Sequence, residues 1–293
     1  RCFMTEATKG VLAMVGACVI WGFSALYYKL LSDITSSEVL AHRTIWSAVC
    51  FVIVLSIQSR LGELRVVLSN KRSLSQVFAA AVLVSTNWYF FIVSVNLGHL
   101  MQSSLGFYIF PLVAVALGAF ILKEPFTRSK KIAVLLAGLA VVQLTLGLGV
   151  APWISLILAF SFGFYGLIKR HVIAGPVVSV TAEVSLLMPL AMAYLAWLYS
   201  TKSGFSPDLT ELILLILSGP LTAIPMILFS YASKRTALST IGLVQYLNPT
   251  IQFSVAVLIF GEAMTFWHTI TFLMIWSGLA IYSVGAMRPQ AAR

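Results

Sequence analysis

An apolar stretch near the carboxyl end of the chain carries several side-chain amides. Gln245, Asn248 and Gln252 are spaced at i, i+3 and i+7 around Tyr246 and Pro249. In an α-helix this spacing places the three amides on one face. An amide that faces hydrocarbon without a partner costs roughly 2 to 7 kcal/mol, so we expect this face to border protein or water. We interpret it as a binding surface for polar groups of a small ligand. The alternative is hydrogen bonding between neighbouring helices.

Aromatic side chains within other apolar stretches extend this candidate site. Buried Trp and Tyr carry polar atoms that need partners, and at mid-membrane depth this favours a lined pocket. Together with the three amides, we predict substrate contacts from Trp21, Asn87, Trp88, Tyr108, Tyr165 and Tyr246. Core packing is the alternative for each single aromatic residue, and Asn87 could instead cap a neighbouring helix.

Ionisable residues near the apolar stretches form a second group. Lys29, Glu38, His42 and Arg43 come close together around the first predicted loop. Charged groups at membrane depth pair with one another and often mark transport pathways. Two interpretations stay open: a titratable vestibule, in which His42 changes charge near neutral pH, or an ion-pair cluster that pins the first two helices. Farther along, Glu183 is the best candidate for a lone proton-coupling acid, although an Arg or backbone partner would make it structural.

The composition indicates the setting in which these residues act. The chain has 293 residues, of which 60% are hydrophobic and 10% charged, with a mean hydropathy of +0.97. Soluble domains have about 45–50% apolar and about 25% charged residues. The sequence therefore predicts an all-α integral membrane protein. The net charge is +10, and the basic residues lie in short connections between the apolar stretches. This pattern sets membrane orientation and argues against a nucleic-acid partner. The three cysteines predict no disulfide framework, and we expect no metal site and no cofactor.

Ten stretches are long enough to cross about 30 Å of hydrocarbon at about 1.5 Å per residue. They are residues 10–31, 37–57, 75–95, 101–122, 129–147, 152–170, 178–199, 210–232, 239–260 and 266–286. Of the 19 basic residues, 16 fall in ends and connections on one side of the predicted membrane. The positive-inside rule places both termini in the cytoplasm.

An internal repeat relates the two halves of the chain. Pro111 and Pro249 lie 138 residues apart, and Glu124 and Glu262 keep the same separation. Because each half holds five spans, an odd number, the second copy must enter the membrane in the opposite orientation. The predicted domains are residues 10–147 and 152–286. Inverted repeats are typical of secondary transporters, whose site lies near the midplane between the halves.

The repeat also predicts hinges and an asymmetric site. A proline frees a backbone carbonyl one turn earlier in a helix, so we predict hinges at Pro111 and Pro249. The second copy carries the amides, whereas the first carries Phe107 and Phe110. We therefore expect a site with one polar wall and one aromatic wall.

Several motifs resemble the RarD branch of the EamA family in the drug/metabolite transporter superfamily. They are Tyr28–Leu30, Glu38–Ser47, Asn87–Trp88, Ser104–Leu112, Ser161–Leu167 and Gln245–Thr250. The resemblance covers essentially the whole chain from Gly10 to Gly285. It implies ten transmembrane helices as two EamA repeats, a bacterial inner-membrane location and export of small molecules. The branch is associated by name with chloramphenicol sensitivity.

The function that we expect from the sequence is secondary active export of small metabolites or drugs by alternating access. Amino-acid-like and amphipathic or aromatic molecules, chloramphenicol among them, are the candidate cargo. No phosphate-binding loop is present in the sequence, so a gradient of substrate or protons would drive transport. The expected partners are the substrate, the lipid bilayer and protons, and we expect a monomer or a weak dimer rather than an enzyme. The alternatives are a membrane-embedded enzyme or structural protein that uses Glu38 and His42, and a channel.

Overall fold

The computed structural model describes residues 5–123, 125–169, 171–172, 174–201, 208–236 and 238–287. Within these ranges every regular element is helical, which confirms the predicted all-α membrane class. Nine helices in the described ranges are long and apolar enough to cross a membrane, and the apolar helix Trp153–Lys169 is shorter. Glu124, which the repeat argument used, lies outside the described residues.

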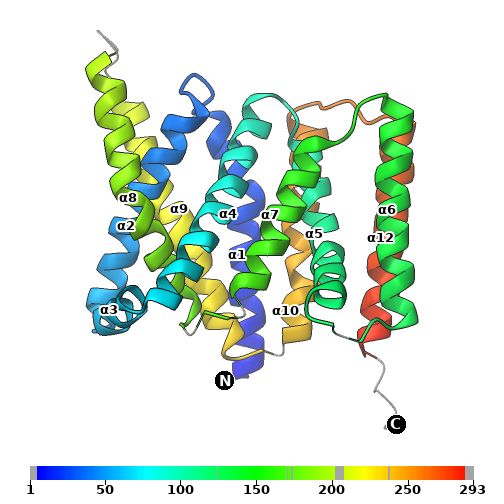
Figure 1. The fold of residues 1–293 in the computed structure, drawn as a ribbon. Helices are drawn as coiled ribbons and strands as arrows, with labels where there is room; N and C mark the ends of the chain where they lie inside the picture. Colours follow the sequence, from blue (N-terminus) through cyan, green and yellow to red (C-terminus); the bar gives the residue numbers. More distant parts are fainter. Residues whose placement is uncertain are drawn as a thin grey trace.

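The helices form one upright bundle, and successive long helices run in opposite directions (Figure 1). They are α1 (Glu6–Lys29), α2 (Ser36–Ile57), α3 (Leu61–Ser69), α4 (Lys71–Asn96), α5 (Leu100–Phe120), α6 (Arg128–Leu148), α7 (Trp153–Lys169), α8 (Pro176–Thr201), α9 (Leu209–Ser233), α10 (Leu238–Gln245), α11 (Leu247–Ser254), a π-helical segment η1 (Val255–Ile259) and α12 (Phe266–Met287). The predicted spans agree with these bounds to within a few residues. The start of α1 and the end of α12 lie at the same end of the bundle.

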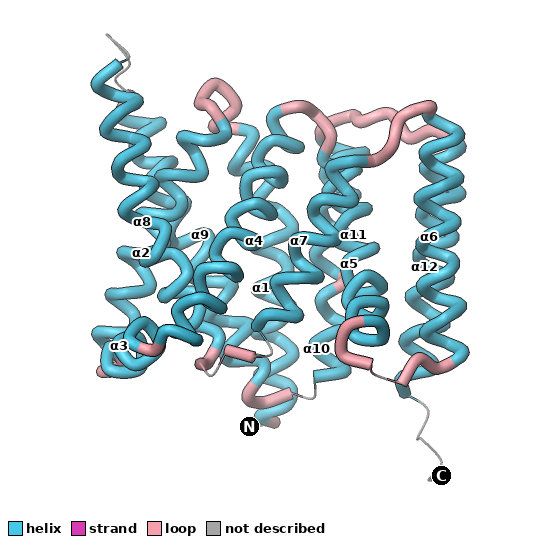
Figure 2. The backbone as a smooth tube through the Cα atoms, viewed as in Figure 1, coloured by secondary structure: helices cyan, strands magenta, loops and turns pink. Residues whose placement is uncertain are grey.

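One helix was absent from the prediction. The short helix α3 lies at the end of the bundle where α1 begins (Figure 2). It has nine residues, too few to span a membrane, and of these only Val67 is buried. An exposed ion pair between Arg60 and Glu63 holds its first turn. The sequence search for spans missed α3 because that search requires a long apolar run.

The predicted span 239–260 is interrupted near its middle. Helix α10 ends at Gln245 and α11 begins at Leu247, with a turn at Tyr246 between them. Pro249 explains the break, because a proline has no N–H to donate to the carbonyl of the residue four positions earlier. By contrast, α5 continues through Pro111 without a break. Of the two predicted hinges, the structure therefore has a helix interruption only beside Pro249.

The long helices pack in pairs that define the interior. Helix α5 lies along α7, α6 along α12, α1 along α9, and α2 along both α8 and α9. The α6–α12 pair stands at one edge of the bundle (Figure 1). In the α2–α9 and α5–α7 pairs, a glycine lies directly against a backbone carbonyl of the neighbouring helix. A Cβ atom added at Gly219 would lie 2.5 Å from the carbonyl oxygen of Trp46, and one at Gly106 would lie 2.8 Å from that of Ser155. Larger residues at these positions would push the helices apart.

Candidate functional site

The side chain of Arg43 lies at a junction of four helices. It projects from α2 and is only 6% exposed. Its Nε donates a hydrogen bond to Thr222 Oγ1 of α9 at 3.0 Å. Its guanidinium carbon lies 4.1 Å from the ring centre of Trp88 on α4 and 5.5 Å from that of Tyr28 on α1. The guanidinium therefore lies over two aromatic rings and donates one hydrogen bond to a hydroxyl.

These contacts leave much of the charge of Arg43 without a partner. Among the described residues, no carboxylate lies within ion-pair distance, and Nε alone makes a hydrogen bond. Four of the five guanidinium N–H donors thus have no acceptor in this part of the protein. Burying an ion costs several kcal/mol. Each cation–π contact returns up to about 2 kcal/mol and the hydrogen bond about 1.5 to 3 kcal/mol, but neither supplies the missing acceptors. The Arg43 guanidinium can therefore bind an anionic group through its remaining N–H donors.

Two buried hydroxyls lie one layer deeper than Arg43. Ser47 follows Arg43 by four residues on α2, and Ser85 precedes Trp88 by three residues on α4. Because α2 and α4 run in opposite directions, both positions lie about 5 to 6 Å closer to the middle of the bundle. Neither Oγ atom has a hydrogen-bond partner in the described structure. In the described structure, two hydroxyls without partners therefore lie at the next level of the two helices that carry Arg43 and Trp88.

The described contacts do not bring Lys29, Glu38, His42 and Arg43 together in one cluster, and their role in coupling stays a prediction. Glu38 and His42 face α8, where the Tyr199 hydroxyl lies 3.0 Å from Glu38 Oε1 and 2.8 Å from His42 Nε2. Lys29 is exposed at the end of α1, 5.9 Å from the ring centre of Phe260. The reason is helical geometry: one residue turns the chain by about 100°, so Arg43 faces away from the side shared by residues 38 and 42. The Glu38–His42 pair ties α2 to α8 instead of α1.

Glu183 is not a lone acid. It is fully buried on α8, and Lys169 Nζ from α7 lies 2.6 Å from its Oε1. The Tyr165 hydroxyl donates to Oε2 at 3.1 Å, and Ser179 donates to Oε1 at 3.0 Å. Lys169 also contacts Ser179 Oγ. The sequence analysis did not connect Lys169 with Glu183. However, Lys169 lies four residues after Tyr165, and this spacing places both on the same face of α7.

The three amides do not share one continuous helical face. Gln245 is the last residue of α10, whereas Asn248 and Gln252 belong to α11. Gln252 Nε2 donates to Asn248 Oδ1 at 3.0 Å, and the buried Gln252 Oε1 has no partner among the described residues. The turn at Tyr246 separates Gln245 from the other two. One amide oxygen therefore remains available in α11.

The contact between α5 and α11 uses residues other than the predicted aromatic wall. Ser104 Oγ donates to the Pro249 carbonyl at 2.8 Å. The Tyr108 and Thr250 hydroxyls are 2.6 Å apart. Tyr108 also stacks on Tyr246, with ring centres 6.4 Å apart and an angle of 18° between the planes.

Phe107 and Phe110 point elsewhere, which corrects the prediction of an aromatic wall. The Phe107 ring lies 6.1 Å from Phe91 on α4 and 6.4 Å from Phe162 on α7. Phe110 lies 5.0 Å from the same Phe162 ring. Positions 104 and 108 share one face of α5, and this face, not that of 107 and 110, meets α11.

Two further predicted site residues make contacts between helices. Asn87 Nδ2 donates to the Leu158 carbonyl at 3.0 Å and to Ser161 Oγ at 3.1 Å, which joins α4 to α7. The Trp21 ring lies 6.5 Å from that of Phe229 on α9. Their role in substrate binding stays a prediction, as does that of Tyr165, whose hydroxyl bonds to Glu183.

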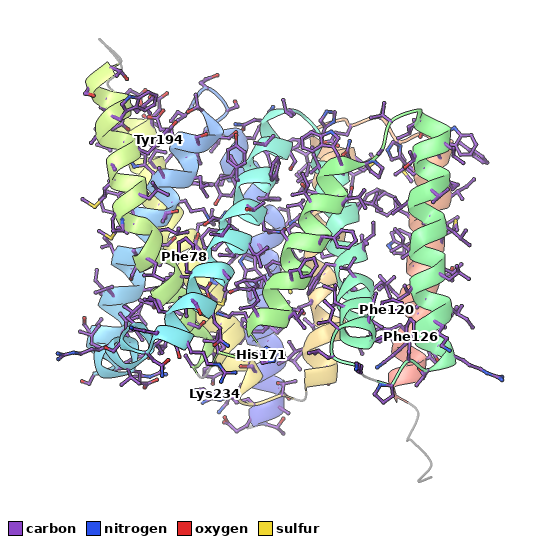
Figure 3. The ribbon with its side chains drawn as sticks, in the orientation of Figure 1. Phe78, Phe120, Phe126, His171, Tyr194 and Lys234 are labelled. Atoms are coloured by element: carbon purple, nitrogen blue, oxygen red, sulfur yellow. The ribbon has the colours of Figure 1, made fainter. Side chains whose placement is uncertain are left out.

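An apolar groove of about 390 Å³ lies between α5, α6 and α7. Its lining includes Leu112, Val113, Phe120 and Phe160. Phe120, the last residue of α5, packs edge-on against Phe126, with ring centres 5.7 Å apart (Figure 3). This lining suits hydrocarbon and offers no partner to polar cargo. The Arg43 cluster, defined as Tyr28, Arg43, Ser47, Ser85, Trp88 and Thr222, is the stronger candidate for binding a polar ligand.

Comparison with known proteins places the chain in a family. The sequence matches the EamA-like transporter family over residues 8–146 and again over residues 150–284. The chain belongs to the EamA-like transporter family. These matches cover nearly the whole chain.

Related proteins agree with this assignment. The EamA-family chain is 40% identical over 285 residues to "Protein RarD" of Streptomyces exfoliatus, covering 97% of this chain and 90% of the relative. It is 36% identical to an "Uncharacterized transporter" of Vibrio cholerae serotype O1, covering 99% of both. A solved structure titled "Crystal structure of protein" aligns with a TM-score of 0.63 at 16% identity, covering 96% of this chain and 99% of that one. That likeness concerns the fold. The EamA-family chain is thus a multi-pass membrane protein whose relatives are named as transporters.

Proposed function

We propose that this protein is a secondary transporter that exports small organic molecules across the bacterial inner membrane by alternating access. The observation that carries the proposal is Arg43, a buried cation with open donors where helices of both halves meet. Helices α1, α2 and α4 belong to the first family match, and α9, which supplies Thr222, belongs to the second. A site built from both halves changes its exposure when the halves move relative to each other.

The same proposal includes two inverted repeats of five helices each. The two family matches divide the bundle between α6 and α7. In the first half α1 packs along α9 and α11; its proposed counterpart α7 packs along α4 and α5. Helices α4 and α5 are the counterparts of α9 and α11, so the packing repeats with the halves exchanged. An odd number of spans per half gives the two copies opposite orientations, and this pattern supports the inverted arrangement.

We place both termini in the cytoplasm. Basic residues accumulate at the end of the bundle where α1 begins and α12 ends, and Lys234 lies at that end (Figure 3). Arg60, Lys71 and Lys130 occupy the turns and helix starts of the same end. The positive-inside rule assigns an end rich in Lys and Arg to the cytoplasm. The opposite end, which carries the α1–α2 and α4–α5 connections, then faces outward.

Each end of the bundle has a tie between the two halves. At the outer end, Glu262 accepts hydrogen bonds from the backbone N–H groups of Leu100 and Met101 at 2.6 and 2.8 Å, so it caps α5. At the inner end, Arg235 pairs with Glu6 at 3.0 Å. The inner pair is solvent-exposed, and such pairs contribute about 0 to 1 kcal/mol. We infer that the two ties open in alternation, and that the inner one opens at lower cost.

Proton coupling is assigned in this proposal to Glu183. Protonation of its carboxylate would remove the charge that holds Lys169, and this would release α7 from α8. Replacement by glutamine mimics the protonated state permanently. We expect Glu183→Gln to transport substrate with a reduced response to a pH gradient. A variant that responds as the parent does would exclude Glu183 as the coupling acid.

The direct test is counterflow in proteoliposomes. Purified protein is reconstituted, loaded with unlabelled amino acids or chloramphenicol, and supplied with trace labelled compound outside. The proposal expects accumulation of at least one labelled compound above that in protein-free vesicles. Absence of exchange for the whole panel, by protein that remains folded, would refute a transporter of this class.

A further inference from the structure

We propose that Arg43 anchors a carboxylate group of the transported molecule, an inference that rests on the proposed transport function. The cargo class is then a small monocarboxylate with an apolar or aromatic body, either a zwitterion such as an amino acid or a simple acid. Neither the family nor the names of the relatives assigns a ligand to this residue.

The geometry of the guanidinium selects this ligand. Thr222 occupies the Nε edge, and Trp88 covers one face at 4.1 Å. The free part is therefore the end edge that carries the two Nη atoms. Two parallel N–H groups at this edge match the two oxygens of one carboxylate, a pairing that Arg makes more readily than Lys. A neutral amide could accept at this edge but would not cancel the charge.

The surrounding charges favour a single negative charge on the ligand. Lys29 lies at the end of α1 beside Phe260, and Lys169 is already paired with Glu183. Among the described residues, Arg43 is thus the one interior cation without an acidic partner. A dianion such as a phosphate monoester would bring one uncompensated charge into the interior, which is costly.

The rest of the Arg43 cluster fits the other parts of such a ligand. Trp88 and Tyr28 offer ring surfaces beside the guanidinium. The hydroxyls of Ser47 and Ser85 lie one layer deeper, buried and without partners in the described structure. A serine oxygen accepts a hydrogen bond from an ammonium or hydroxyl group. A ligand that spans both layers would satisfy groups that the described residues leave without a partner.

A carboxylate anchor at Arg43 distinguishes two candidate substrates that the sequence analysis proposed, amino acids and chloramphenicol. An amino acid carries a carboxylate, whereas chloramphenicol carries none. We expect amino acids or other carboxylic acids to depend on Arg43 and chloramphenicol to be indifferent to its loss. The difference can be measured on one preparation of protein.

The test uses matched pairs of acid and amide on purified full-length protein. The probes are L-phenylalanine with L-phenylalaninamide, L-leucine with L-leucinamide, and benzoate with benzamide. Binding is measured by ligand-induced thermal stabilisation. For at least one pair, the acid should bind the parent protein about 10- to 100-fold more tightly than the amide, the range expected of a charge-assisted hydrogen bond. Arg43→Gln should bind the two members of that pair equally.

Two further variants guard against a simple folding defect. Arg43→Lys keeps the charge but loses the paired N–H edge, so it should keep about a tenth of the acid's affinity. Thr222→Val keeps the arginine and removes the acceptor that orients it, so acid binding should weaken by about 3- to 10-fold with amide binding unchanged. Size-exclusion profiles and melting curves without ligand establish that each variant is folded.

The outcomes distinguish this inference from the transport proposal. If no acid in the panel exceeds its amide in the parent, or if Arg43→Gln keeps the preference, the carboxylate anchor is refuted. If an amide or chloramphenicol is nevertheless exchanged in proteoliposomes, the protein is a transporter whose cargo does not use Arg43. If nothing is exchanged, the transport proposal itself fails and the anchor fails with it.

Discussion

Replacing Lys169 by methionine should destabilise the protein by about 3 to 5 kcal/mol, because the change leaves the Glu183 carboxylate buried without its counter-ion. Glu183 is fully buried, and the Lys169 ammonium lies 2.6 Å from its Oε1. Methionine preserves most of the apolar length of lysine, so lost packing adds little. The remaining donors, the hydroxyls of Tyr165 and Ser179, are neutral and cannot replace the charge.

The double variant Lys169→Met/Glu183→Gln separates the charge effect from the packing effect. With both charges removed, the penalty for an unpaired ion disappears, and most of the lost stability should return. Unfolding free energies are measured by titration with denaturing detergent, with tryptophan fluorescence as the signal. Lys71→Met, at an exposed position at the start of α4, is the control and should change stability by less than about 0.5 kcal/mol. Equal destabilisation by the single and double variants would refute the reasoning.

The remaining predictions concern separate parts of the bundle. Burial raises the pKa of Glu262 above its ordinary value of 4.5, so folding favours its protonated form. The unfolding free energy of the parent relative to Glu262→Gln should fall as the pH rises from 4.5 through the raised pKa; a difference that does not vary with pH would contradict this. Asn248→Ala and Gln252→Ala should each abolish counterflow while the purified variants stay folded by size-exclusion profile, and normal exchange by both would exclude the amides from the site. Gly219→Val places a side chain against a carbonyl 2.5 Å from the added Cβ, so it should cost at least about 1 to 3 kcal/mol by detergent titration. If Gly219→Val is as stable as the parent, the prediction is wrong, because α9 can then move away from α2 without a loss of stability.

Hydropathy located most of the membrane helices because every spanning backbone must bond within itself. The predicted limits 37–57 and 210–232 differ from α2 and α9 by one residue at the most divergent ends. The same method missed α3, which is too short and too amphipathic to register as a span. It also treated 239–260 as one helix, although Pro249 was recognised as a candidate hinge. Whether a proline interrupts a helix depends on its neighbours, since α5 continues through Pro111.

The candidate site was harder to predict than the helices. Arg43, Trp88 and Tyr28 were all in motifs that the sequence singled out, but their association was not. The residues that hydrogen-bond to Arg43 and to Glu38 come from distant parts of the chain. Thr222 is 179 residues from Arg43, and Tyr199 is 161 residues from Glu38. One signal was available for Glu183: Lys169 and Tyr165 lie on one face of α7, four residues apart.

The sequence by itself determined the membrane class, the approximate limits of the spans and the presence of polar groups that cannot face lipid. These follow from local chemistry, because each depends on the hydrophobicity and spacing of nearby residues. Tertiary structure alone decided which polar groups find partners. It paired Glu183 with Lys169, placed Glu38 and His42 on α8, and left Arg43 among aromatic rings without an acidic partner in the described chain. The physical reason is that a side chain's electrostatic balance is set by the helices packed around it, and helix packing brings together residues that lie far apart in the sequence.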